Sequence, residues 1–170
     1  MSVNEMREFK PEQLPRRGEL NAWLLALVAF IGLMVLNRAL TVVPGWAWIF
    51  SGFLVFSALS ISFGNWMDRN TRLVLDADGI SFENGIRRVR LRWQEVQKVA
   101  VLPSRLGESV QVLGEKSHFD FKTLGEVQFK GEVRGRTGFS DGKTILDVIL
   151  READLALVEE SNNAYYYARG

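Results

Sequence analysis

Two long apolar stretches dominate the first half of the chain, at residues 20–36 and 46–63. Apart from Arg38, no Asp, Glu, Lys or Arg lies between Glu19 and Asp68. An α-helix needs about 20 largely apolar residues to cross the hydrocarbon layer of a membrane. Each stretch, together with the residues beside it, therefore predicts a membrane-spanning helix, with Arg38 near the end of the first.

The two predicted helices form a hairpin over residues 20–67, with spans at about 20–40 and 46–67 and a turn at Pro44-Gly45. A cleaved signal peptide is a competing interpretation, but its apolar region would be shorter, and a second apolar segment would not be expected soon after it. Buried core helices of a soluble protein are another, and these would carry more polar residues on one face. Tryptophan prefers the membrane–water interface. Four tryptophans mark the predicted interface positions: Trp23, Trp46, Trp48 and Trp66.

Lysine and arginine are more frequent on the two outer flanks of the hairpin than in its connecting loop, whose only basic residue is Arg38. An excess of basic residues is typical of cytoplasmic flanks. We therefore expect a multi-pass protein of the cell (inner, cytoplasmic) membrane with both termini in the cytoplasm, residues 1–19 being a cytoplasmic N-terminal segment. The flanking basic residues are Arg7, Lys10, Arg16 and Arg17 before the hairpin, and Arg69 and Arg72 after it.

From Thr71 onward, apolar and polar residues alternate with a period of two, which is typical of β-strands with one buried face. The clearest case is the segment in which three arginines alternate with Val89, Leu91 and Trp93, and Trp93 is expected to pack in the core. The predicted strands cover residues 72–75, 80–83, 88–93, 96–101, 110–113, 119–121 and 127–134.

Two short turns separate the first three of these predicted strands. At 76–79 we expect Asp side chains to bond the backbone and Gly79 to supply a positive φ. Asn84-Gly85 is typical of a β-hairpin turn.

The pattern becomes helical near the C-terminus, where Ile145, Leu146, Ile149 and Ala153 share one face. Ser140 or Asp141 can cap this helix at its start. Residues 159–170, with three consecutive tyrosines, are expected to form a tail. The predicted fold is an α-helical transmembrane hairpin plus a β-rich (α+β) small barrel or sandwich over residues 71–158, closed by a C-terminal helix.

A resemblance to a known family rests on two segments, TRLVLDADGISFENGIRRVRLRWQEVQKVAV and SDGKTILDVILREADL. They resemble the opening strands and the closing helix of bacterial pleckstrin-homology-like (PH-like) domains that follow a two-helix membrane hairpin. The shared features are an acidic turn ending in Gly-Ile, a basic strand, and the step Trp93-Gln94-Glu95-Val96. The resemblance covers residues 1–158 in architecture and implies a PH-like fold for the part after the hairpin.

Composition excludes several function classes. The chain after Met67 carries 16 Lys/Arg and 16 Asp/Glu, so binding to nucleic acid is not expected. There is no cysteine and only one histidine, His118, and we expect no catalytic, cofactor or metal site. The interiors of the two predicted spans hold no ionisable side chain, since Arg38 lies near the end of the first, and this favours an anchor over a transporter.

The remaining candidate site is a basic cluster on one predicted strand. Its side chains could contact anionic lipid or a partner, or they could form a solvated face balanced by acidic neighbours. We expect a non-catalytic interaction or scaffolding module whose partners are membrane lipids and other membrane proteins, such as an accessory or assembly subunit of a larger complex. The alternative is an anionic-lipid-binding module that uses Arg88, Arg90 and Arg92. The cluster consists of Arg87, Arg88, Arg90 and Arg92.

Overall fold

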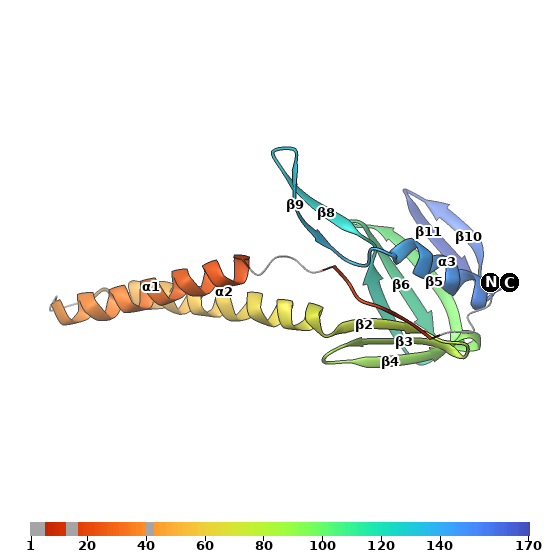
Figure 1. Ribbon diagram of the computed structural model, residues 1–170, viewed down its shortest axis with the longest axis horizontal. Coiled ribbons are helices and arrows are strands. Elements are labelled where there is room, and N and C mark those ends of the chain that lie inside the picture. The colour runs from red at the N-terminus through yellow and green to blue at the C-terminus, as the bar shows by residue number, and fades with distance from the viewer. Residues whose placement is uncertain (1–5, 13–16, 40–42) are drawn as a thin grey trace. The chain divides into compact units, whose positions relative to one another are not determined.

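The computed structural model describes residues 6–12, 17–39 and 43–170 (Figure 1). The chain divides into two compact units. One is helical and comprises residues 15–66, and the other is β-rich and comprises residues 1–14 and 67–170. Leu40, the expected end of the first span, and Arg16 of the basic flank lie outside the described residues.

The helical unit contains α1 (Arg17–Ala39) and most of α2 (Gly45–Arg69). Both helices are long and apolar enough to cross a membrane, as predicted. A core helix of a soluble protein would be largely buried, but the most apolar window of α1 is 6% buried and that of α2 is 11% buried. The rest of the chain therefore leaves most apolar side chains of α1 and α2 uncovered.

Polar contacts join α1 to α2 toward one end of the pair. The Trp23 indole N–H donates to the Ser62 hydroxyl at 2.8 Å, and the Asn65 amide donates to the Glu19 carboxylate at 2.9 Å. These contacts show that the start of α1 lies beside the end of α2. The side chains that are buried in these two helices are all small: Ala26, Ser51 and Ala58.

The β-rich unit contains two antiparallel sheets and a separate hairpin. The four-stranded sheet has the order β1 (Arg7–Phe9), β2 (Thr71–Leu75), β3 (Gly79–Asn84), β4 (Arg88–Arg92). The five-stranded sheet has the order β10 (Ala156–Ser161), β11 (Ala164–Ala168), β5 (Val96–Pro103), β6 (Glu108–Gly114), β7 (His118–Lys122). The hairpin is β8 (Gly125–Phe129) with β9 (Glu132–Thr137), and it projects away from the sheets (Figure 1). The short 3₁₀ helix η1 (Trp93–Glu95) links β4 to β5, and α3 (Gly142–Glu152) follows β9.

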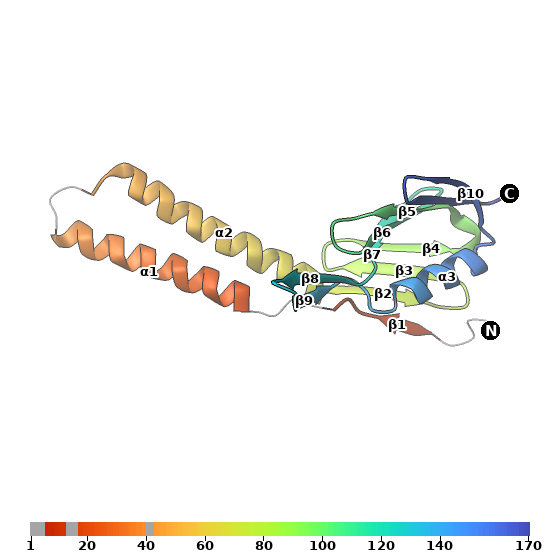
Figure 2. The same cartoon turned by 90° about the horizontal axis from the view of Figure 1, so that it is seen from above.

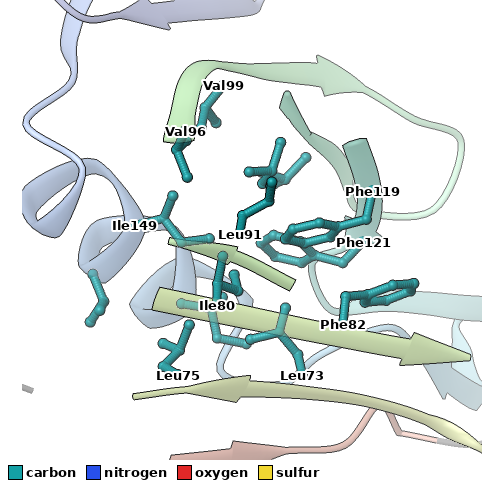
Figure 3. Packing of buried hydrophobic residues seen from close by; sticks show 14 of the residues in the cluster. Leu73, Leu75, Ile80, Phe82, Leu91, Val96, Val99, Phe119, Phe121 and Ile149 are labelled. Carbon is teal, nitrogen blue, oxygen red and sulfur yellow. The ribbon is translucent and has the colours of Figure 1, made fainter. Parts of the chain in front are cut away.

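One apolar core joins the two sheets and α3 (Figure 3). Phe82 of β3 stacks on Phe119 of β7, with ring centroids 5.1 Å apart and an interplanar angle of 9°. Ile145 and Ile149 of α3 are fully buried in the same cluster. The alternation predicted for β4 is confirmed, because Val89 and Leu91 are buried and the three arginines that alternate with them are exposed. Trp93 is also buried, as expected.

The turn at 76–79 forms as predicted, but glycine serves another purpose there. The Asp76 carboxylate accepts hydrogen bonds from the amides of Asp78 and Gly79 at 2.9 and 2.8 Å. Gly79 does not have a positive φ. Instead, a Cβ at this position would come within 2.1 Å of the Leu91 carbonyl oxygen on β4. The glycine is needed because the two strands approach closely.

Three segments differ from the sequence prediction. Part of the N-terminal segment forms β1, which pairs with β2 at the edge of its sheet (Figure 2). The single strand expected over 127–134 is wrong: Lys130 and Gly131 adopt positive φ and turn the chain back, which gives β8 and β9. The tail expected over 159–170 is also wrong, because β11 pairs with β5 inside the five-stranded sheet.

The C-terminal hairpin is stabilised by a tight turn and by Arg169. Asn162 and Asn163 both have positive φ, at 48° and 61°, as a two-residue hairpin turn requires. The Arg169 guanidinium donates to the carbonyl oxygens of Trp93, Gln94 and Ala153 at 3.0–3.2 Å. These bonds tie the end of the chain to η1 and to the end of α3.

Candidate functional site

The predicted basic cluster lies on the exposed face of β4 and in the turn before it. Arg88, Arg90 and Arg92 all project from this face, as the alternation predicted. Arg87 lies in the preceding turn, where the Asn84 side chain accepts hydrogen bonds from the amides of Ile86 and Arg87. The strand therefore presents three arginines in a row, with the fourth at its start.

Acidic neighbours balance the three arginines of β4. Each guanidinium has a carboxylate partner within 3.3 Å, and Glu83 also accepts from Arg72 at 2.7 Å. Ion pairs with exposed partners contribute little stability, but they reduce the net charge that a ligand would meet. The pairs are Arg88–Glu83, Arg90–Asp76 and Arg92–Glu95.

The pairing also lowers the pKa values of two of these carboxyl groups. Hydrogen bonds from Arg72 and Arg88 lower the pKa of Glu83 below its usual value of 4.5. The pKa of Glu95 is lowered in the same direction, first by the Arg92 backbone amide and then by the Arg92 side chain. Both carboxyl groups therefore favour the folded state when they are ionised.

We expect the stability of the β-rich unit to fall with acidification, in part through Glu83. A carboxyl group with a lowered folded-state pKa stabilises the fold above its unfolded pKa, near 4.5, and this contribution is lost as pH falls through the lower folded value. In Glu83→Gln the loss of stability between about pH 5 and 3 should be smaller than in the unchanged chain. Hydrogen exchange of the full chain in detergent, measured across this range, checks the expectation. An unchanged pH profile would contradict it, and Asp154→Asn, distant in sequence from the β4 pairs, is the control.

A second candidate site is a cavity of about 240 Å³ at the junction of α2 and β2, which we call the junction cavity. The last turn of α2 and the turn after β3 contribute Asp68 and Arg87 to its lining. Strand β7 contributes Asp120 and Lys122. The apolar part of the lining includes Phe82, Phe119 and Phe139.

Backbone hydrogen bonds fix two sides of the junction cavity. The Glu12 amide donates to the Gly138 carbonyl at 2.7 Å, which holds the segment after β1 against the end of β9. The Phe139 amide donates to the Lys122 carbonyl at 2.9 Å. The walls therefore come from segments far apart in the sequence that are joined by main-chain bonds.

The charged residues of the junction cavity differ from those of β4 in their pairing. Among the residues that the structure describes, Asp68, Arg87, Asp120 and Lys122 form no ion pair within 4 Å. The positive charge of Lys122 acts electrostatically on the Asp68 carboxylate. These four side chains are exposed, so their charges are available to a ligand.

The sequence prediction found one of these four residues, Arg87. It did not group Asp68, Asp120 and Lys122 as a site, because Asp68 is followed by Arg69, and Asp120 and Lys122 alternate with apolar residues as on any exposed strand face. The only signal in the sequence was the position of Asp68, directly after the predicted second span. The cavity itself depends on long-range strand pairing that no local pattern reveals.

The four tryptophans lie at or near the helix ends, as predicted. Trp46, near the start of α2, is 71% exposed. Trp48 meets Phe30 of α1 edge to face, with centroids 6.3 Å apart. Trp66 stacks on Phe63 at 5.9 Å, and Trp23 bonds Ser62 as described above.

His118 is exposed at the start of β7. No group of three or more His, Cys, Asp or Glu residues suited to a metal ion occurs within residues 6–12, 17–39 and 43–170.

Comparison with known proteins adds no relative. No protein family, curated protein or solved structure matches the chain. The function must therefore be argued from the residues themselves.

Proposed function

We propose that the chain is a membrane-anchored, non-catalytic interaction module, with its β-rich unit on the cytoplasmic side of the cell membrane. One observation carries this proposal: two long apolar helices whose apolar windows are only 6% and 11% buried. Apolar surface of that extent needs cover that the chain does not supply, and a bilayer supplies it. Because Asn70 alone separates α2 from β2, the β-rich unit is held at the membrane surface.

We further propose that the β-rich unit is PH-like. Two successive antiparallel meanders, β2–β4 and β5–β7, are followed by the β8–β9 hairpin and then by an amphipathic helix that contributes to the common core of the meanders. This order supports the relation implied by the sequence segments quoted above. The β10–β11 hairpin after the helix is an addition that extends the second sheet.

The proposed partner is another membrane protein, with this chain as an accessory or assembly subunit. Anchoring two proteins in one membrane raises their effective concentration for each other. Strand β10 ends its sheet, and all six of its residues are exposed, including Leu157 at 50% and Val158 at 67%. An exposed edge strand with apolar side chains can accept a strand from a partner.

Photo-crosslinking in native membranes tests this function. A photoreactive residue at position 158 is expected to capture one membrane protein that also copurifies with the unmodified chain at fixed stoichiometry. The matched control is position 113, where Leu113 is also exposed, but on the interior strand β6. Equal capture from both positions, or no stable copurifying protein, would contradict the proposal.

The alternative is recognition of anionic lipid by Arg88, Arg90 and Arg92. It has less support, since each of these arginines already pairs with a carboxylate. If the face bound lipid, replacing all three with alanine would weaken association of the β-rich unit with anionic but not neutral bilayers. If β4 is protected from hydrogen exchange to the same degree in anionic and in neutral bilayers, lipid recognition by this face is excluded.

A further inference from the structure

We propose that the junction cavity binds the headgroup of a zwitterionic phospholipid, one that carries a phosphate and a primary ammonium group. The inference rests on the membrane insertion proposed above. It concerns a different surface from both β10 and the exposed face of β4. The argument uses the depth of the cavity, the state of its charges and the balance of their signs.

Depth follows from covalent connection. Trp66 near the end of α2 is a predicted interface residue, and the next two residues, Met67 and Asp68, line the cavity. An α-helix rises about 1.5 Å per residue, so Asp68 lies roughly 3 Å along the helix from Trp66. If Trp66 lies at headgroup level, the cavity wall lies there too. Phosphate and ammonium groups of lipids occupy that layer.

Charge availability separates this cavity from the basic strand. The arginines of β4 each have a carboxylate within 3.3 Å. Among the described residues, Arg87 and Lys122 have no such partner within 4 Å. A ligand phosphate would therefore gain charge-assisted hydrogen bonds at the cavity without displacing an existing ion pair.

The balance of signs selects the kind of headgroup. Arg87 and Lys122 provide two cationic donors for a phosphate, while Asp68 and Asp120 provide two carboxylate acceptors for an ammonium group. A purely anionic headgroup would leave these carboxylates facing like charge, which is unfavourable. A primary ammonium can donate hydrogen bonds to carboxylates, whereas a trimethylated one cannot.

Size and polarity fit a headgroup rather than a larger ligand. A volume of about 240 Å³ is below the range of drug-sized pockets, which is about 300–1,000 Å³. Phe82 and Phe119 add an apolar wall that the carbon atoms next to the phosphate can contact. The cavity thus offers cations, anions and apolar surface for the three parts of such a headgroup.

The test is lipid binding by the full-length chain in detergent, followed by native mass spectrometry. Short-chain phosphatidylethanolamine, phosphatidylcholine and phosphatidylglycerol are titrated separately, together with free phosphoethanolamine and inorganic phosphate. We expect phosphatidylethanolamine to bind at least tenfold more tightly than the other two lipids, and more tightly than the free phosphates. Equal binding of all three lipids, or preference for phosphatidylglycerol, would overturn the proposal. Tighter binding of free phosphoethanolamine would assign the cavity to a soluble ligand instead and would also overturn it.

Two sets of variants locate the site. Arg87→Ala with Lys122→Ala should lower affinity for phosphatidylethanolamine about tenfold or more. The matched control is Lys116→Ala, in the turn before the same strand β7 and outside the cavity lining. Asp68→Asn with Asp120→Asn should shift preference toward phosphatidylglycerol, a gain that misfolding cannot imitate. Loss of binding in the Lys116→Ala control, or no shift of preference in the Asp variants, would contradict the assignment.

This experiment is independent of the anchoring proposal in its outcome. Binding in detergent does not require the chain to span a bilayer, so a failure of lipid selectivity leaves insertion to be judged by labelling in cells. If the helices do not insert, there is no reason to place the cavity at headgroup level, whatever the lipid titration shows.

Discussion

Replacing Phe119 with alanine is expected to lower the free energy of unfolding of the β-rich unit by about 3–5 kcal/mol, as for other buried phenylalanines. Phe119 is 2% exposed and stacks on Phe82 of the opposite sheet at 5.1 Å. Truncation therefore removes apolar burial and an aromatic contact, and it leaves a cavity where the two sheets meet. Amide hydrogen exchange of the full-length chain in detergent, read on β5 and β6, measures the loss.

The matched control for this change is Leu113→Ala on the neighbouring strand β6. Leu113 is 39% exposed, so its truncation should cost less than about 1 kcal/mol. If the two variants lose similar stability, the two sheets do not share the core described above. A loss confined to β7, with β5 and β6 unaffected, would contradict cooperative unfolding of the unit.

The second large effect is expected in the hairpin. Phe56 lies near the middle of α2 and is 67% exposed. An arginine at the centre of a spanning helix opposes insertion by about 2.5–3.5 kcal/mol. Phe56→Arg should therefore lower the insertion equilibrium constant of α2 about a hundredfold, and with it the inserted fraction, since each 1.4 kcal/mol is a factor of ten in an equilibrium constant.

The chain offers a clean measurement of that fraction because it contains no cysteine. A single cysteine at Lys116, in the β6–β7 turn, reports the side of the membrane on which the β-rich unit lies. When α1 spans and α2 does not, this cysteine moves to the outer side and reacts with an impermeant maleimide in intact cells. Phe56→Leu is the control and should leave the cysteine protected. Protection in Phe56→Arg as well would contradict the expected loss of α2 insertion.

Local sequence patterns predicted the elements whose contacts are close in sequence. The two helices follow from uncharged runs of about 20 residues, and their bounds at Arg17–Ala39 and Gly45–Arg69 differ from the prediction by a few residues. Strand β4 follows from its strict alternation, and the Asn84-Gly85 turn from its glycine, whose φ is 81°. In each case one periodicity or one turn dipeptide was sufficient.

Local patterns do not predict the elements whose pairing partners are distant in the sequence. Strand β1 has only three residues, and both helices of the hairpin separate it in sequence from its partner β2. The Tyr run of strand β11 has no strict alternation that would predict a strand, although Asn162-Asn163, with positive φ at both residues, is a hairpin-turn signal. The lining of the junction cavity includes Glu12 and Gly138, which are far apart in the sequence and are joined by an isolated antiparallel bridge.

The proposed anchoring requires the apolar hairpin to span the cell membrane and to hold the β-rich unit on the cytoplasmic side. Single cysteines at Gly45 and at Lys116 test it most directly, in intact cells exposed to an impermeant maleimide. Gly45 suits this use because an added Cβ there meets no atom within 4 Å. We expect labelling at position 45 before lysis and at position 116 only after lysis. Labelling at position 116 in intact cells, or protection of position 45, would contradict it.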